Sequence, residues 1–319
     1  MRCYRLTSFD SPPKLSEIPT PIPSTGEVLI RIASCGLNFA DLLMLQGKYQ
    51  ETPEPPFSPG LEFAGTVEAL GPETDGPAPG TRVAVYGGRG GLAEYACVSA
   101  QRVIPLPEAI DFDTAAALQI AYGTSHMALD HKARLQPGET LLVLGAAGGV
   151  GLTAVEIGKL MGARVIACAR GAEKLEIARA HGADHLIDAK TQDIREEVLA
   201  LGGADVVYDP VGGDQFRAAL RATNPEGRIL AIGFASGDVP QIPANHLLVK
   251  NVDVLGFYWG GYLKFRPDVL TDSLATLFKW AAEGRIKPHI SNRLPLERVE
   301  EGLELIRSRA STGKVVINP

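Results

Sequence analysis

The stretch from Ser34 to Tyr49, SCGLNFADLLMLQGKY, carries four side chains that could take part in chemistry. Cys35, Asn38, Asp41 and Tyr49 lie within sixteen residues. None of them has metal-ligand spacing, and the four cysteines of the chain lie far apart without a CxxC pair. Amide, carboxyl and phenol groups can hydrogen-bond a polar ligand. The stretch is therefore either the wall of a metal-free active site or a buried turn.

A glycine-rich loop, AAGGVG (146–151), directly follows an apolar run. It places Ala146, Gly148 and Gly151 at the three positions of the dinucleotide-binding fingerprint, with the first glycine replaced. Gly148 would let the backbone approach a pyrophosphate, and Gly151 would let the next helix pack on the strand. The loop residues expected to hold a cofactor are Ala147, Gly148, Gly149 and Val150.

The end of the next apolar run indicates which dinucleotide would bind. An NAD-specific site has an acidic residue there, about 20 residues after the glycines, to hold the ribose hydroxyls. This chain has ACARGAEK instead, with Arg170 in place of the acid and Lys174 one helical turn beyond. Two cations favour the 2′-phosphate of NADPH. In the competing interpretation they are solvated loop charges and Glu173 serves as a displaced acid.

Elements that would position these groups follow from the sequence pattern. Six apolar runs of strand length alternate with helical stretches, which predicts consecutive βαβ units and a doubly wound parallel sheet. Before residue 111 the chain has short alternating segments with many prolines, which predicts compact β structure. A last short strand at 314–319 could rejoin that part. The runs expected as strands of the parallel sheet are 140–145, 164–169, 185–188, 205–209, 228–233 and 252–257.

Bulk composition excludes several classes of function. The 319 residues are 45% hydrophobic and 21% charged, as in a globular protein of about two domains. A net charge of -6 makes nucleic acid a poor partner. The N-terminus has no signal pattern, and the longest apolar run stops at Glu156, so we expect no membrane association. Scattered cysteines fit a reducing cytoplasm.

Several motifs in order make the whole chain resemble the zinc-independent quinone oxidoreductases, the zeta-crystallin type, of the medium-chain dehydrogenase/reductase superfamily. The resemblance implies a GroES-like catalytic domain (1–119 and 260–319), an NADPH-binding Rossmann domain (120–259) and an active site in the cleft between them. It also implies a homodimer through the edge strand at 252–259, although Tyr258 and Trp259 could equally be monomer core residues. The motifs that carry it are GLNFADLLMLQGKY (36–49), PFSPGLEFAGTV (56–67), AAALQIAYGTSHMAL (115–129), GETLLVLGAAGGVG (138–151), DVVYDPVGG (205–213) and SRASTGKVVI (308–317).

The zinc alcohol dehydrogenases of the same superfamily explain the opening stretch. They have Gly-x-Cys-His-x-Asp where this chain has GLNFAD, and Gly-His-Glu where it has GLE (60–62). Asn38 therefore stands at the cysteine position and Leu61 at the histidine position. Neither side chain supplies the sulfur or imidazole that zinc requires. We expect no metal.

Hydride transfer without a metal suits an acceptor that is already electrophilic, such as a quinone or an enone. Asn38 and Tyr49 are the candidate donors to the acceptor oxygen, and Leu43 replaces a further tyrosine found in some relatives. Asp41 matches the family's catalytic stretch, but a loop aspartate is more often a helix cap. The resemblance adds five cofactor contacts: Thr124, Val150, Val211, Phe234 and Arg309. A tyrosine that some relatives direct at the 2′-phosphate is Ala189 here.

Three functions remain open at this stage. The first is an NADPH-dependent quinone reductase. The second uses the same machinery on enones or enoyl thioesters, for which no compelling basic cluster is evident. The third, from another class, is a non-catalytic NADPH-binding structural protein. Pocket shape decides which acceptor is the physiological one.

Overall fold

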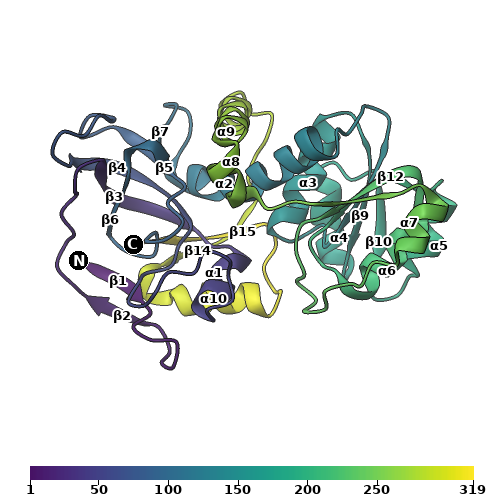
Figure 1. Cartoon of the computed structure of the whole chain (residues 1–319), viewed down its shortest axis with the longest axis horizontal. Helices are drawn as coiled ribbons and strands as arrows, with labels where there is room; N and C mark the ends of the chain where they lie inside the picture. The colour runs from purple at the N-terminus through teal and green to yellow at the C-terminus, as the bar shows by residue number, and fades with distance from the viewer. The chain divides into compact units, whose positions relative to one another are not determined.

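The computed structural model describes all residues from 1 to 319, which form two compact units. Unit 1 consists of residues 1–120 and 278–319, and unit 2 of residues 121–277. Two helices, α2 (Phe112–His126) and α9 (Pro267–Ala282), contain the boundaries. In the colours of Figure 1, unit 2 is the teal and green part.

The second boundary falls later in the chain than the 260 expected from the sequence. Residues between position 260 and this boundary are packed within unit 2. The rings of Tyr262 and Phe257 lie 5.5 Å apart, and the Ser273 hydroxyl lies 2.8 Å from Nδ1 of His126. These contacts keep residues 260–277 with the parallel sheet.

Unit 2 is a six-stranded parallel sheet of order β10-β9-β8-β11-β12-β13, the order of a dinucleotide-binding fold. Each of the six runs expected as a strand forms one, which confirms the Rossmann prediction. The strands are β8 (Thr140–Leu144), β9 (Arg164–Ala169), β10 (His185–Asp188), β11 (Ala204–Asp209), β12 (Thr223–Ala231) and β13 (Asp253–Gly256). The helices are α3 (Gly149–Leu160), α4 (Ala172–Ala180), α5 (Ile194–Ala200), α6 (Gly213–Ala222), α7 (Ala244–Lys250) and α8 (Tyr262–Phe265).

Burial explains why the strands of unit 2 are continuous apolar runs in the sequence. All five residues of β8 are buried, because helices cover both faces of a parallel sheet. Trp259 is also buried, and its ring lies so close to Gly123 that a side chain at Gly123 would strike it. The monomer-core alternative therefore fits Trp259, while Tyr258 is half-buried.

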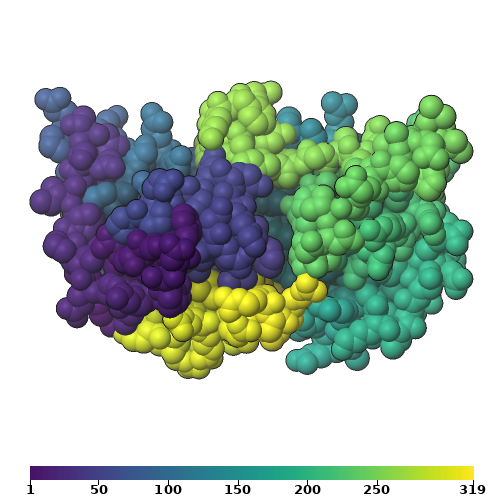
Figure 2. Space-filling view, turned by 60° about the horizontal axis from the view of Figure 1, so that its bottom comes forward, coloured from purple at the N-terminus to yellow at the C-terminus, as the bar shows by residue number.

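Unit 1 is built on a sheet of order β14-β15-β3-β4-β5-β7, with β6 pairing with β3. The last strand, β15, pairs antiparallel with β3, so the chain end does rejoin the first part. In Figure 2 the yellow C-terminal residues accordingly lie against purple N-terminal ones. The strands are β1 (Arg2–Arg5), β2 (Lys14–Glu17), β3 (Glu27–Gly36), β4 (Glu62–Leu70), β5 (Arg82–Val85), β6 (Tyr95–Ser99), β7 (Val103–Pro105), β14 (Ile290–Pro295) and β15 (Lys314–Asn318), and the helices are α1 (Phe39–Leu45) and α10 (Val299–Arg307).

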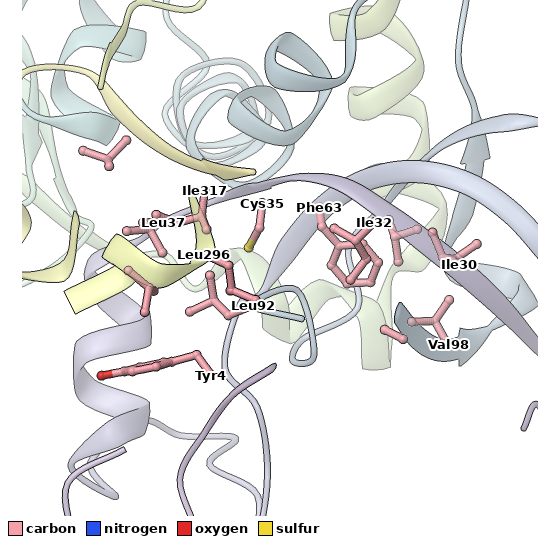
Figure 3. Packing of buried hydrophobic residues seen from close by; sticks show 14 of the residues in the cluster. Tyr4, Ile30, Ile32, Cys35, Leu37, Phe63, Leu92, Val98, Leu296 and Ile317 are labelled. Carbon is pink, nitrogen blue, oxygen red and sulfur yellow. The ribbon is translucent and has the colours of Figure 1, made fainter. Parts of the chain in front are cut away.

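A large apolar cluster forms the main core of unit 1 (Figure 3). Ile30 and Ile32 from β3 and Phe63 from β4 lie in it, and residues near the C-terminus complete it. Cys35 and Ile317 are both fully buried members. The core of unit 1 is thus made from both ends of the chain. No helix of the whole structure is both long enough and apolar enough to cross a membrane.

Candidate functional site

Asp41 lies in the first turn of α1, a helix that begins shortly after β3 and has Asn38 as its N-terminal cap residue. Its carboxylate is fully buried and accepts the backbone N–H of Asn38 at 2.8 Å and that of Gly60 at 2.9 Å. Burial raises the pKa of Asp41 to about 6, against the two N–H groups, which lower it. Asp41 therefore holds the start of α1 to the loop before β4, as a helix cap would. Its catalytic assignment stays a prediction.

A buried ion pair joins the beginnings of two strands of unit 1. The Lys314 ammonium, at the start of β15, donates to Oε1 of Glu62, at the start of β4, at 2.7 Å. It also donates to Oδ1 of Asn38 and to the carbonyl of Leu37, each at 2.8 Å. The side chains of Lys314 and Glu62 are 3% and 0% exposed. All three ammonium hydrogens thus have an oxygen partner.

The amide of Asn38 is fully engaged in this same network. Its Nδ2 donates to Oε1 of Glu62 at 2.9 Å and to the carbonyl of Gly36 at 3.2 Å. The other oxygen of Glu62 accepts the backbone N–H of Ile120 at 2.7 Å. A substrate oxygen would have to displace one of these partners to receive a hydrogen bond from Asn38. The structure thus gives Asn38 a structural role, and its direct catalytic contact remains a prediction.

Tyr49 and Leu61 lie in a smaller apolar cluster beside α1. Leu61 is buried with Leu6, Met44 and Phe57, and the half-buried ring of Tyr49 packs against them. At the position where zinc relatives have a histidine, the chain therefore has a core residue. Cys35 is also buried, which raises the pKa of its thiol well above the usual range and makes it a poor nucleophile.

The glycine loop of unit 2 is built as the sequence predicts, between β8 and α3. Gly151 is required by packing, because a Cβ there would lie 2.2 Å from the carbonyl oxygen of Gly145. Gly148 is different. Its φ of -80° suits any residue, and a Cβ would meet only one atom, at 3.4 Å. The protein's own packing does not need a glycine at 148, and the space that this glycine leaves at the start of α3 fits a close-lying phosphate group.

Three buried hydroxyl groups form a hydrogen-bond network that reaches this loop at Val150. The Ser125 hydroxyl donates to the carbonyl of Val150 at 3.0 Å and lies 2.7 Å from that of Thr153 and 3.0 Å from that of Tyr208. Thr124, the neighbour of Ser125 on α2, is itself buried. The network fixes the first turn of α3 relative to α2 and β11.

The other cofactor positions expected in unit 2 follow carboxyl ends of parallel strands. Arg170 follows β9 and is exposed, Val211 follows β11, and Phe234 follows β12 with 42% of its surface exposed. The loop 146–150 follows β8. Because the strands are parallel, these ends share one edge of the sheet, where nucleotides bind in such folds. Lys174 lies half-buried on α4.

A carboxylate also lies at this edge. Asp188, at the end of β10, accepts the backbone N–H of Gly171 at 3.1 Å and that of Lys190 at 2.9 Å, and these N–H groups lower its pKa. It ties together the two loops beside Arg170. Arg309, the last expected cofactor residue, belongs to unit 1, where it is exposed in the turn after α10. Its contact with a cofactor stays a prediction.

Glu62 and Lys314 are the site residues that the sequence reasoning missed. Both lie within motifs that carried the resemblance, but neither has a metal-ligand or catalytic spacing. The available signal was their position, because each is a charged residue that opens a strand and is followed directly by apolar residues, in EFAGTV and KVVIN. Two opposite charges in such places can pair across a buried sheet.

Comparisons with known proteins agree with this geometry. The chain matches the family described as "Alcohol dehydrogenase GroES-like domain" over residues 24–108 and that described as "Zinc-binding dehydrogenase" over 149–276. It is 43% identical to quinone oxidoreductase-like protein 2 homolog of Nematostella vectensis, over 92% of this chain and 82% of that one. It is 33% identical to the human synaptic vesicle membrane protein VAT-1 homolog, over 100% and 86%.

A solved structure extends the likeness to three dimensions. The quinone oxidoreductase of Thermus thermophilus, described with its NADPH complex, superposes with a TM-score of 0.88 at 33% identity, over all of both chains. The GroES-like and Rossmann parts expected from the sequence are thereby confirmed. The chain therefore belongs to the medium-chain dehydrogenase/reductase superfamily of oxidoreductases, among its quinone oxidoreductase-like members.

Proposed function

We propose that the protein transfers hydride from NADPH to a quinone without a metal ion. The observation that carries the cofactor part is Gly148, a glycine that the fold itself does not require. Its place at the start of α3 offers backbone N–H groups and room for a pyrophosphate. The NADPH complex of the Thermus thermophilus quinone oxidoreductase supports the same choice of cofactor. Bound NADPH would supply the hydride.

The metal-free part rests on the donor set around Glu62. In zinc relatives this region supplies thiolate and imidazole, whereas here it supplies an amide and a carboxylate already bound to the Lys314 ammonium. A quinone needs no Lewis acid, because its carbonyl groups are conjugated and electrophilic. A hydride and one proton from water convert it to the hydroquinone, so the step needs no further reactant.

Tyr49 is the stronger of the two candidate contacts to the acceptor. Asn38 has both amide hydrogens and its oxygen engaged with Gly36, Glu62 and Lys314. Tyr49→Phe should therefore raise the KM for the quinone or lower kcat while leaving NADPH affinity unchanged. Asn38→Ala should act mainly by lowering the melting temperature. The reverse pattern would assign the acceptor contact to Asn38.

A direct test compares three electrophiles side by side. NADPH oxidation is followed by its absorbance with 1,4-benzoquinone, a 2-alkenal and crotonyl-CoA, using metal-free buffer with and without a chelator. We expect turnover with the quinone, unaffected by the chelator. Faster turnover of crotonyl-CoA or the alkenal would make the protein an enoyl or enone reductase. Tight NADPH binding without turnover of any of them would make it a binding protein.

The preference for NADPH is tested at Arg170 and Lys174. Both cations are expected to meet the 2′-phosphate, so the double variant Arg170→Ser, Lys174→Ala should weaken NADPH binding about tenfold, or about 1.4 kcal/mol. NADH affinity should not change, since NADH lacks that phosphate. Arg221→Ser is the control for a simple loss of positive charge. Arg221 is exposed at the end of α6, just before β12 begins. It therefore lies at the amino ends of the strands, opposite the carboxyl ends where the cofactor is expected. Equal loss for NADPH and NADH would remove the assignment.

The resemblance also implies a homodimer, which we propose to form through β13. This strand ends the parallel sheet and pairs only with β12. Leu248 and Val249, on the preceding helix α7, are 78% and 75% exposed. An unpaired edge beside exposed apolar groups suits a second copy of the chain. Light scattering should give twice the mass of 33.9 kDa, and Val254→Pro should shift it to a single chain.

We further propose that the protein acts in the cytoplasm. Its four thiols are all unpaired, as is usual for proteins of that compartment.

A further inference from the structure

We propose that unit 1 contains a cation-binding site of three oxygens whose resident cation is the ammonium group of Lys314. The carbonyl oxygen of Leu37, Oδ1 of Asn38 and Oε1 of Glu62 converge on Nζ at 2.8, 2.8 and 2.7 Å. A carbonyl, an amide and a carboxylate are the oxygen types with which proteins bind hard cations. Here the chain itself supplies the cation.

The sheet positions these oxygens independently of the lysine side chain. Gly36 of β3 is the register partner of Glu62 on β4 and of Val316 on β15, so the backbones of all three segments are fixed beside one another. Glu62 is further held by the N–H of Ile120, and Asn38 by the carbonyl of Gly36. The three oxygens should therefore stay in place when the lysine is shortened.

The two charges of the site are buried, while Asn38 is half-buried, so the site depends on its charge balance. Glu62 is completely buried and Lys314 nearly so. A carboxylate without a partner in such surroundings is strongly disfavoured, so the site requires one positive charge. Asp41 is the other acidic group coupled to it, since Lys314 lowers and Glu62 raises the pKa of Asp41. Removing the lysine side chain should leave a vacancy that accepts a small external ammonium ion.

The experiment is chemical rescue of Lys314→Ala, measured by thermal unfolding of the full chain. We expect a melting temperature well below that of the wild type, raised by several degrees by ethylammonium chloride. Tetramethylammonium chloride at the same concentration has the same charge but no N–H donors, and it should have no such effect. The wild type should respond to neither salt. Equal responses to both salts, or no rescue by ethylammonium, would overturn the proposal. The readout uses no cofactor or acceptor, so it stands independently of the proposed reaction.

A second pair of variants keeps the proposal testable if Lys314→Ala does not fold. Lys314→Met keeps the length of the side chain without its charge and should lower the melting temperature. Adding Glu62→Gln removes the charge left behind and should recover most of the loss. If Lys314→Met melts like the wild type, or if Glu62→Gln adds to its loss, the ammonium is not the cation of this site.

Discussion

The two units differ in how the polar groups at their candidate sites are satisfied. In unit 1 the region around α1 is filled by the protein's own groups, with the Lys314 ammonium enclosed by Leu37, Asn38 and Glu62. In unit 2 the start of α3 is left open, because Gly148 has no side chain where one would fit. One region satisfies its polar groups internally, and we propose that the other offers helix N–H groups to the cofactor.

The difference shows that the region in unit 1 depends on charge and the region in unit 2 depends on side-chain size. The filled region needs its charges to balance, because they are buried with little access to water. The open region contains no titratable side chain in the loop 146–151, so small residue size matters there. Substitutions should therefore affect stability in unit 1 and ligand affinity at Gly148 in unit 2.

Breaking the ion pair in unit 1 should have the largest effect. Glu62→Gln leaves the buried Lys314 ammonium without the carboxylate that it contacts, and we expect the free energy of unfolding to fall by about 3–5 kcal/mol. Urea unfolding of both proteins measures the change. Glu301→Gln, which breaks the surface pair with Arg298, is the matched control and should cost less than about 1 kcal/mol. Similar losses in the two variants would contradict the contrast between buried and exposed pairs.

The next effect concerns the pH dependence of the same region. Burial raises the pKa of Asp41 from 3.8 to about 6, so between these values the folded protein binds a proton more readily than the unfolded chain. Stability from this group is therefore greatest below pH 4 and is lost as the pH rises to about 6, by up to about 3 kcal/mol.

Asp41→Asn provides the comparison for this pH effect, because it cannot titrate. The stability difference between variant and wild type should change between about pH 4.5 and pH 7, with the wild type losing relatively more. Urea unfolding at the two pH values gives this difference. A constant difference would show that Asp41 has no raised pKa.

The two units also differ in how much of them the sequence could predict. All six strands of unit 2 were expected, because a buried parallel strand is a continuous apolar run bounded by turns. The end of that unit was less visible. Tyr262 and Ser273 belong to it through contacts with Phe257 and His126, and no local pattern in the sequence encodes such contacts.

Site residues show the same limit. The place of the loop around Gly148, between β8 and α3, was expected, since the spacing of small residues after a strand is itself the signal. Lys314 and Glu62 lie 252 residues apart, and their pairing depends on the register of β15, β3 and β4. Asn38 was expected to be a hydrogen-bond donor to an acceptor oxygen, and only the structure shows which three partners its amide has.

In unit 2, substitution of Gly151 should lower stability less than substitution of Glu62 does. Gly151→Ala places a Cβ 2.2 Å from the carbonyl oxygen of Gly145, which is backbone and can move only with β8. We expect overpacking of about 1–3 kcal/mol, measured by urea unfolding. NADPH affinity should fall as well, because the start of α3 is displaced. A variant as stable as the wild type would show that the helix can shift at no cost.

Gly148→Ala should separate ligand binding from stability and so sharpen the comparison most. Its φ of -80° suits alanine, and the added Cβ meets only the carbonyl oxygen of Gly145, at 3.4 Å. A weaker helix cap is offset by the lower entropy of the unfolded chain, so stability should change by less than about 1 kcal/mol. The methyl group would occupy space proposed for the pyrophosphate, and NADPH affinity should fall about tenfold, or about 1.4 kcal/mol, in a fluorescence titration. Undiminished affinity would mean that the phosphates do not lie against residue 148, and the open region would then need another explanation.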